Sequence, residues 1–499
     1  VFHPYTLSNR IFALALAALL LAGALVHLTG YDRGLPLYES KDERNNIHEV
    51  YAQRGLTDAP LWKPGYPPGI LYVNHAVQLI VERVTGKPAT DCTCEIVHGL
   101  RLTGIVVNLT AIAGMAFVAR WFGGNLAGLL VPALWLFNVN VLSEAQYAFP
   151  QIYEHLLFVA ALGFAIRALT RRSMTFAVLS TVAGLAAVVF KYPQFPVLGL
   201  GVGVAVWQLW RLPAERGRWG GVLGVQVALI LACAAWLWFG YDAGRLLDTA
   251  HEETNVLTSG GGLVQLVTPA VLWLRFTALT TQAALPPLLF LPLVTVGTAV
   301  LWRRMDTNRR LVMVALIGLV ILHTLTLVVT LDGDNIGLRQ NYTVSSYATL
   351  WAVVSLLAIV AQIRDASGRD TILRGGLALI AVGWLGMTVP RGIDYVIERR
   401  LPVTFAELPV WAGQLLPFTE DAAIAVSDNR PFIGEWSCYN GPHHPAPRYD
   451  PLVTYPLDQW IADGVAFVQM DGGILAELDA AGLTDDYLPN MTPIATFPA

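Results

Sequence analysis

The sequence predicts an all-α polytopic membrane protein with about eleven transmembrane helices and a small C-terminal extramembrane α/β domain. Two observations lead to this fold class. Of the 499 residues, 55% are hydrophobic and only 14% are charged, whereas a soluble protein carries about 25% charged residues. The apolar residues also form runs long enough to cross a bilayer, which takes about 20 residues per helix. The net charge of −4 is small and says nothing about nucleic acid, but the sequence has no basic patch of the kind that binds phosphates, so no nucleic-acid partner is expected.

The apolar runs define a membrane domain over residues 1–390 and leave residues 391–499 as a soluble domain. The first run is too long for a cleaved signal peptide and lacks a clear small-residue cleavage site, so we expect an uncleaved anchor. Residues 70–86 are amphipathic and predict a helix at the membrane interface rather than a span. The spans are expected at residues 11–29, 100–119, 125–142, 154–170, 174–190, 195–210, 220–239, 282–302, 311–330, 344–363 and 373–390.

Arginine residues set the expected orientation. If the N-terminus is inside, alternate short loops carry Arg120, Arg167, Arg171, Arg172, Arg211, Arg216, Arg218, Arg303, Arg304, Arg309, Arg310, Arg364, Arg369 and Arg374. By the positive-inside rule this side is cytoplasmic. We therefore expect a multi-pass inner (plasma) membrane protein with a cytoplasmic N-terminus. The long loop 30–99 and the C-terminal domain then lie on the outer or periplasmic side.

The polar loop from Gly30 to Gly69 is the segment best suited to chemistry, because it gathers carboxylates, amides, a histidine and aromatic residues between spans. If Ser40 caps a helix, Glu43 lies at the third position after it, as in a capping box. Asp42 and Glu43 then occupy the first turn, where the helix dipole favours carboxylates. An interfacial helix with a solvated charged face is the alternative interpretation. The prolines of the W-K-P-G-Y-P-P-G step that follows hold the chain extended.

The tail after Pro390 differs in composition from the membrane domain. It has proline-rich connectors, β-like runs at Ala423–Val426 and Val465–Met470, and a helical stretch around Gly473–Ala481. These features predict a small α/β domain on the outer face.

The four cysteines are too few for a disulfide scaffold. Cys92, Cys94 and Cys438 lie in segments expected on the same outer side, so one disulfide can form among them, whereas Cys233 is expected in the core. The D-C-T-C-E sequence with His98 has metal-ligating residue types, but the C-x-C spacing without a second pair disfavours a metal site.

The order of these elements resembles the GT-C superfamily of membrane glycosyltransferases, and most closely its protein O-mannosyltransferase and aminoarabinose-transferase branch. The likeness covers about residues 10–210 as a pattern. The sequence departs from the branch at Gly69-Ile70, where the family more often has Leu-Gly. The matching features are Asp42-Glu43 in the first outer loop, the helix end Tyr51-Ala52-Gln53-Arg54-Gly55, the Tyr66-Pro67-Pro68 step, the span opening with Arg101-Leu102, and Lys191-Tyr192 at the outer end of a span.

This resemblance implies inverting transfer of a sugar from a polyprenyl-phosphate donor to an acceptor at the outer membrane face. A hydroxyl acceptor needs a carboxylate base, a role that matches Asp42, while Glu43 orients that base or binds the acceptor. The leaving lipid phosphate needs cations, and Lys191 and Arg339 are the first candidates. Snorkelling to lipid headgroups is the alternative role for such cations. The other expected substrate-binding residues are Arg54, Lys63, His48 and Tyr66.

The implied transfer needs no cofactor, because lysine and arginine can hold the phosphate. Asp332 and Asp334 would bind a divalent metal if the enzyme resembled metal-using oligosaccharyltransferases, but a glycine-rich turn is the alternative interpretation. The implied partners are a polyprenyl-phosphate-linked sugar, membrane lipids, and a protein, lipid or polymer acceptor. Two other functions stay open: a catalytically idle structural subunit of a larger membrane complex, and a transporter of lipid-linked sugars. A transporter predicts ionisable residues within the spans and a repeat between the halves.

Overall fold

The computed structural model is almost entirely helical over the part of the chain that it describes. It describes residues 8–31, 41–56, 67–145, 147, 149–241, 287–330 and 342–367, parts of 375–397, residues 423–426 and 465–469, and the single residues 479 and 482. The helices up to the first long gap are α1 (Asn9–Leu28), α2 (Lys41–Gln53), α3 (Gly69–Thr85), α4 (Thr93–Leu136), α5 (Val139–Ala145), α6 (Pro150–Arg171), α7 (Met174–Phe190), α8 (Leu198–Arg211) and α9 (Arg216–Gly240).

The described part of the chain also contains three further labelled helices, three short 3₁₀ helices and two strands, and residues 382–386 and 388–394 are helical as well. The helices are α13 (Pro287–Arg304), α14 (Thr307–Thr330) and α15 (Tyr342–Ser367), and the 3₁₀ helices are η1 (Ala89–Asp91), η2 (Tyr192–Val197) and η3 (Pro213–Glu215). The strands are β1 (Ala423–Val426) and β2 (Val465–Gln469).

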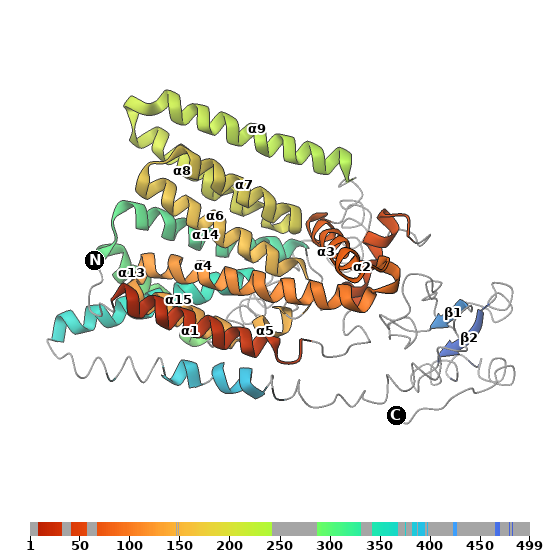
Figure 1. The fold of residues 1–499 in the computed structure, drawn as a ribbon. Coiled ribbons are helices and arrows are strands. Elements are labelled where there is room, and N and C mark those ends of the chain that lie inside the picture. Colours follow the sequence, from red (N-terminus) through yellow and green to blue (C-terminus); the bar gives the residue numbers. More distant parts are fainter. Residues whose placement is uncertain are drawn as a thin grey trace. The chain divides into compact units, whose positions relative to one another are not determined.

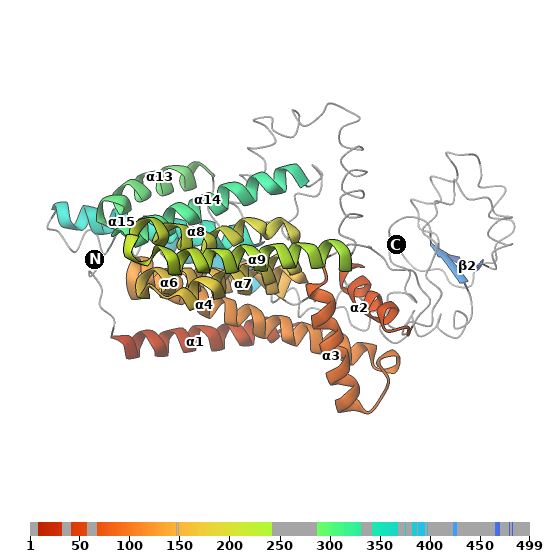
Figure 2. The same ribbon diagram turned by 90° about the horizontal axis from the view of Figure 1, so that it is seen from above.

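The chain divides into two compact units. The first unit contains residues 1–31, 63–73 and 100–400, and the second contains residues 32–62, 74–99 and 401–499. Within the first unit the long helices run side by side as a bundle, which both views show (Figure 1, Figure 2). The predicted outer loop 30–99 thus contributes most of its residues to the same unit as the predicted soluble domain.

The described helices coincide with the predicted spans up to residue 363. The five that are long and apolar enough to cross a membrane lie at Asn9–Leu28, Thr93–Leu136, Pro150–Arg171, Pro213–Gly240 and Tyr342–Ile363. The protein is therefore a polytopic helical membrane protein, as its sequence predicts. Of the predicted span 373–390, the structure describes residue 375 and residues 382–386 and 388–390, all of them helical. The total of eleven spans remains a prediction.

The two spans predicted at 100–119 and 125–142 lie in two helices that α4 joins at a kink at Gly124. The second helix folds back on the first, since a Cβ at Gly128 would lie 2.9 Å from the Ala116 carbonyl. Helix α4 continues through Arg120 and is broken only at Gly124, where φ is +77°. With ψ at −170° this backbone conformation is essentially restricted to glycine and strains a residue with a side chain by about 1–3 kcal/mol, so glycine makes the break possible. The sequence pattern therefore located both helices and the break between them correctly.

Two helices show the difference between the centre and the edge of the bundle. Helix α15 is mostly buried, and its apolar residues belong to one large core that α4, α6 and α13 also line. Helix α9 is mostly exposed and directs Val225, Val227 and Leu231 outward. Exposed apolar side chains of this kind suit a helix that faces lipid.

Arginines predicted to share one membrane side do meet at one end of the bundle. Arg120 donates to the Asn9 side chain at 2.6 Å. Arg309 donates to the carbonyl of Trp121 at 3.2 Å, and Arg211 donates to the side chain of Asn308. These contacts connect α1, α4, α8 and α14 at what we call the arginine-rich end. Its assignment to the cytoplasm remains a prediction.

The two β-like runs of the tail form the strands that the sequence predicts. β1 and β2 pair in parallel, with Ala423 opposite Val465 and Val426 opposite Gln469, and the register shifts between Ala423 and Ile424. The remainder of the tail, including most of the expected helical stretch, lies outside the described residues. The complete α/β domain is thus still a prediction.

Candidate functional site

A buried carboxylate lies at the end of the bundle opposite the arginine-rich end. Glu154 is in the first turns of α6, and its side chain is only 1% exposed. It accepts hydrogen bonds from the Gln194 amide and, at 2.5 Å, from the Thr343 hydroxyl. The Gln194 amide nitrogen is also 3.4 Å from Nε2 of His323. Segments far apart in the sequence, α6, η2, α14 and α15, therefore meet at one polar cluster.

Lys191 faces this carboxylate from the end of α7. Its Nζ is 3.9 Å from Oε2 of Glu154, which is within ion-pair range but longer than a hydrogen bond. Among the described residues, no acceptor lies within hydrogen-bond distance of the ammonium. The Lys191 side chain is 16% exposed. An ammonium has three donors, so Lys191 can still bind an anion from its exposed side.

The local sequence explains why Lys191 occupies this place. Helix α7 ends at Phe190, Lys191 is extended with φ −158°, and Pro193 follows in η2. Proline disfavours a helical residue before it and cannot continue the α7 hydrogen-bond pattern. The Phe190 ring stacks on Tyr153 at 5.3 Å between centroids. This contact places the end of α7 next to the start of α6, and thereby Lys191 next to Glu154.

The Pro67-Pro68-Gly69 step packs on the same end of α7. Pro67 and Pro68 are buried, and a side chain at position 69 would place its Cβ 2.7 Å from the Phe190 ring and 2.9 Å from the Val189 carbonyl. Only glycine fits this approach. The departure from the family pattern at Gly69 is therefore explained by its contact with Phe190.

A second buried polar group adjoins the first through chain neighbours. His155 follows Glu154 and lies against the rings of Trp135 and Tyr342. The Tyr342 hydroxyl donates to Asn108 at 2.7 Å, and the Asn108 amide is 3.3 Å from Nε2 of His27. Neither ring nitrogen of the fully buried His155 has a hydrogen-bond partner among the described residues. This group extends the polar interior across α1, α4, α6 and α15.

Further hydroxyls on α15 are buried but bond within their own helix. Ser345 donates to the Tyr342 carbonyl, Ser346 to the Thr343 carbonyl, and Thr349 to the Ser345 carbonyl. Because these hydroxyls are satisfied locally, we assign them a structural role. Thr343 differs, since its hydroxyl reaches across to Glu154.

The predicted catalytic pair lies on α2 in the second unit, and α2 begins at Lys41, as the predicted cap at Ser40 requires. Glu43 is fully buried on the face formed by Asn46, Ile47, Val50 and Tyr51, residues at helical spacing. The alternative interpretation of a solvated charged face is wrong for Glu43. The side chain of Asp42 lies outside the described residues.

Arg54, a predicted substrate-binding residue, and the nearby Tyr51 both form hydrogen bonds that connect segments of the second unit. Arg54 donates to Gln78 and to both carboxylate oxygens of Glu82, each at 2.9 Å. The Tyr51 hydroxyl donates to the Ala89 carbonyl at 3.1 Å and lies 2.9 Å from the Thr93 hydroxyl. Burial raises the pKa of Tyr51 well above its ordinary value. Arg54, expected as a substrate-binding residue, therefore connects α2 to α3 in this structure.

Of the other predicted substrate-binding residues, the structure describes His48 but not Lys63, Tyr66 or Arg339. The half-buried ring of His48 packs against Tyr51 at 5.7 Å between centroids. Lys63, Tyr66 and Arg339 lie outside the described residues, as do the candidate metal ligands Asp332 and Asp334. Cys94 forms a disulfide, whereas Cys92 and Cys233 carry free thiols, and Cys438 lies outside the described part.

Sequence reasoning missed Glu154, His155, Gln194 and His323. The signal was present, because ionisable residues inside membrane spans are expensive and usually functional, and the run beginning Y-E-H at Tyr153 is otherwise apolar.

Comparison with known proteins shows similarity only at the level of solved structures. No protein-family model and no curated protein matches the chain. The archaeal oligosaccharyltransferase AglB from Archaeoglobus fulgidus, in complex with an inhibitory peptide and a dolichol-phosphate, has 13% identity and a TM-score of 0.45, covering 86% of this chain and 64% of its own. ArnT from Cupriavidus metallidurans in the apo state has 14% identity and a TM-score of 0.48, covering 94% of this chain and 88% of its own.

The ArnT structure bound to undecaprenyl phosphate has 13% identity and a TM-score of 0.45, covering 95% of this chain and 88% of its own.

Proposed function

We propose that this protein is a membrane glycosyltransferase that moves a sugar from a polyprenyl-phosphate donor to an acceptor hydroxyl at the outer membrane face. The observation that carries the proposal is the Lys191 ammonium. It is held by a buried carboxylate at the end of a membrane helix, is partly exposed, and has no hydrogen-bond acceptor among the described residues. A lipid phosphate at the bilayer surface is an anion that would reach such a cation.

The proposed reaction is a single displacement. The acceptor oxygen attacks the anomeric carbon, and the bond between that carbon and the phosphate oxygen breaks with inversion. The acceptor proton passes to a carboxylate, for which Asp42 is the proposed base. The negative charge that develops on the leaving phosphate is stabilised by Lys191. Glu154 does not touch the donor in this scheme and acts as a positioning residue for Lys191.

The experiment that tests the phosphate role measures transfer from radiolabelled polyprenyl-phosphate sugars to endogenous acceptors in membranes. Lys191→Met is expected to lower transfer by about a hundredfold or more, as expected when a transition-state charge contact is lost. Lys191→Arg retains the charge and is expected to keep more activity. Lys87→Met serves as the control, because Lys87 is exposed. Wild-type transfer that Lys191→Met leaves unchanged would refute the phosphate role.

The same assay tests the base separately. Asp42→Asn keeps the size of the side chain but removes the proton acceptor, and a loss of about a hundredfold or more is expected. Unchanged transfer would move the base to Glu43 or another carboxylate. Absence of transfer by the wild type with every donor would favour an idle structural subunit.

A transporter of lipid-linked sugars is the second candidate, because Glu154, His155 and His323 are buried in the helices of the first unit. Ionisable residues inside membrane helices often mark transport pathways. Reconstituted vesicles distinguish the two functions. A transporter moves a labelled lipid-linked sugar across the bilayer and leaves its phosphate bond intact, whereas the transferase breaks that bond only when an acceptor is present.

A further inference from the structure

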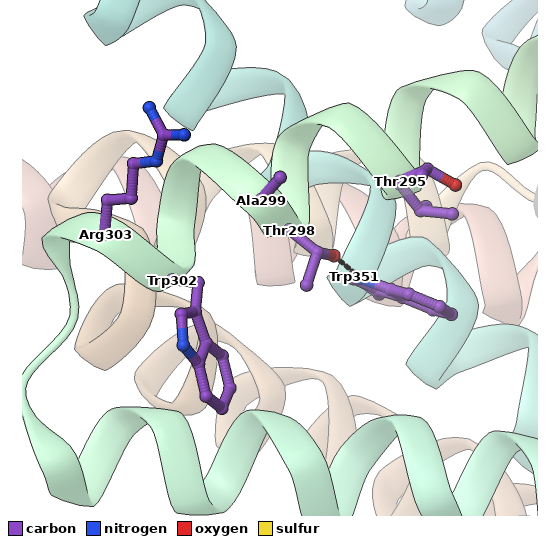
Figure 3. A pocket seen from close by; sticks show the side chains of 7 residues that line it. Thr295, Thr298, Ala299, Trp302, Arg303 and Trp351 are labelled. Carbon is purple, nitrogen blue, oxygen red and sulfur yellow. Dashed lines mark hydrogen bonds between the residues drawn. The ribbon is translucent and has the colours of Figure 1, made fainter.

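A hollow lies between α13 and α15 at the arginine-rich end of the bundle, opposite Lys191. Its volume is about 510 Å³, and it is lined by Val294, Thr295, Thr298, Ala299, Trp302, Arg303 and Trp351. Figure 3 shows Arg303 and Trp302 leaving α13 in opposite directions, with Thr298 and Trp351 facing each other farther along the helix. The lining residues of α13 recur every four positions along the helix, and Trp351 is the residue of α15 among them.

The hollow is open to the surface, and contacts between α13 and α15 hold its wall in place. At Gly297 the helices touch, since a Cβ there would lie 2.2 Å from Cβ of Ser355 on α15. The Trp351 indole donates to the Thr298 hydroxyl at 2.8 Å. Phe290 packs edge-on against the same indole, with 6.0 Å between ring centroids. The position of Trp351 is therefore fixed from two sides, and the wall of the hollow requires little rearrangement to accept a ligand.

The guanidinium of Arg303 lies at one end of the hollow. Arg303 is exposed and has no hydrogen bond or ion pair to any described residue. Its neighbours differ in this respect. Arg304 pairs with Asp365 at 2.8 Å. Arg310 donates to the Trp302 carbonyl at 2.9 Å and lies over the Trp302 ring.

We propose that this hollow binds an anionic glycerophospholipid, with its phosphate on Arg303 and one acyl chain along the apolar and aromatic wall. Arginine has a planar fork of donors that matches phosphate geometry. Basic pockets between membrane helices commonly bind acidic lipid headgroups. The site is distinct from the proposed donor site, because Lys191 lies at the opposite end of the bundle. The proposal therefore stands independently of the transferase function.

The test is native mass spectrometry of the full-length protein in detergent, titrated with phosphatidylglycerol or with phosphatidylcholine of the same chain length. Wild type is expected to bind one phosphatidylglycerol about tenfold more tightly than phosphatidylcholine, the scale of one charged hydrogen bond. Arg303→Gln is expected to remove this preference. Arg171→Gln is the matched control, since Arg171 is another exposed arginine predicted on the same membrane side.

A second variant tests the apolar part of the hollow. Ala299→Phe places a ring in the hollow from an exposed position on α13 and leaves Arg303 in place, so tight binding of either lipid should be lost. The melting temperature of each variant confirms that it is folded. The proposal is overturned if Arg303→Gln retains the preference, if Arg171→Gln loses it equally, or if Ala299→Phe binds as wild type does. Equal binding of both lipids by wild type would also overturn it.

Discussion

Substituting either partner of the ion pair between Glu154 and Lys191 should change stability, but by different amounts. Removing the cation by Lys191→Met leaves a carboxylate that is 1% exposed, whereas removing the anion by Glu154→Gln leaves an ammonium that is 16% exposed and can turn toward solvent. An uncompensated buried charge is far more destabilising than one that water can reach. The two single variants should therefore differ in stability although each removes the same interaction.

The magnitude follows from the geometry. At 3.9 Å and an effective dielectric constant of about 20, Coulomb's law gives an attraction of about 4 kcal/mol. In Glu154→Gln this loss is offset by release of the carboxylate from its desolvation penalty, which is several kcal/mol. The Gln oxygen can still accept from Thr343 and Gln194, so we expect a net loss of about 1 kcal/mol. In Lys191→Met nothing offsets the loss, and we expect about 3–5 kcal/mol.

The assay is reversible unfolding of the purified protein in mixed micelles, followed by tryptophan fluorescence, for wild type, both single variants and the double variant. The double variant carries neither charge and should lie within about 1 kcal/mol of Glu154→Gln, because contacting residues are not additive. It also separates stability from activity, since it is expected to fold and yet lack the proposed phosphate contact. Equal destabilisation by the single variants, or an additive double variant, would refute this account of the pair.

Three other predictions concern single residues. Tyr51→Phe should lower the unfolding free energy of the second unit by about 1–2 kcal/mol, measured by pulse proteolysis. Because burial raises the pKa of Tyr51, the stabilising contribution of this tyrosine is complete below about pH 10 and is lost as pH rises further. The Tyr51→Phe variant should lack this pH dependence. Cys92 is buried and the pKa of its thiol is raised by burial, so alkylation at pH 8 should occur only after unfolding, and rapid labelling of the native protein would contradict its placement. Gly124→Ala should destabilise the bundle by about 1–3 kcal/mol in the micelle assay, and an unchanged value would contradict the positive φ at this position.

The sequence could predict what depends on local pattern. Apolar runs located the helices of the bundle, alternating arginines predicted which helix ends meet, and short β-like runs located β1 and β2. The start of α2 at Lys41 followed from the capping pattern at Ser40. Each of these features is determined by residues within one or two turns of each other.

The candidate site was less predictable because its contacts join distant segments. Lys191 was expected to bind an anion, but Glu154 lies 37 positions before it, and Thr343 lies 189 positions after Glu154. No local pattern indicates such a pairing. Arg54 shows the opposite error, since an arginine that looked available for substrate is bound to Glu82. In contrast, the burial of Glu43 could be inferred from its helical spacing to Ile47 and Val50.

The order in which the polar cluster is synthesised has a consequence for membrane insertion. Glu154 leaves the ribosome before Lys191, Gln194 and Thr343, so α6 must enter the bilayer while its carboxylate still lacks these partners. A carboxylate at the centre of a span would oppose insertion by about 2.5–3.5 kcal/mol, and one near an end by less. Because Glu154 lies in the first turns of α6, it can wait at the headgroup level until α7 and α15 arrive. Moving the same Glu two turns deeper would make insertion of α6 depend on segments that do not yet exist.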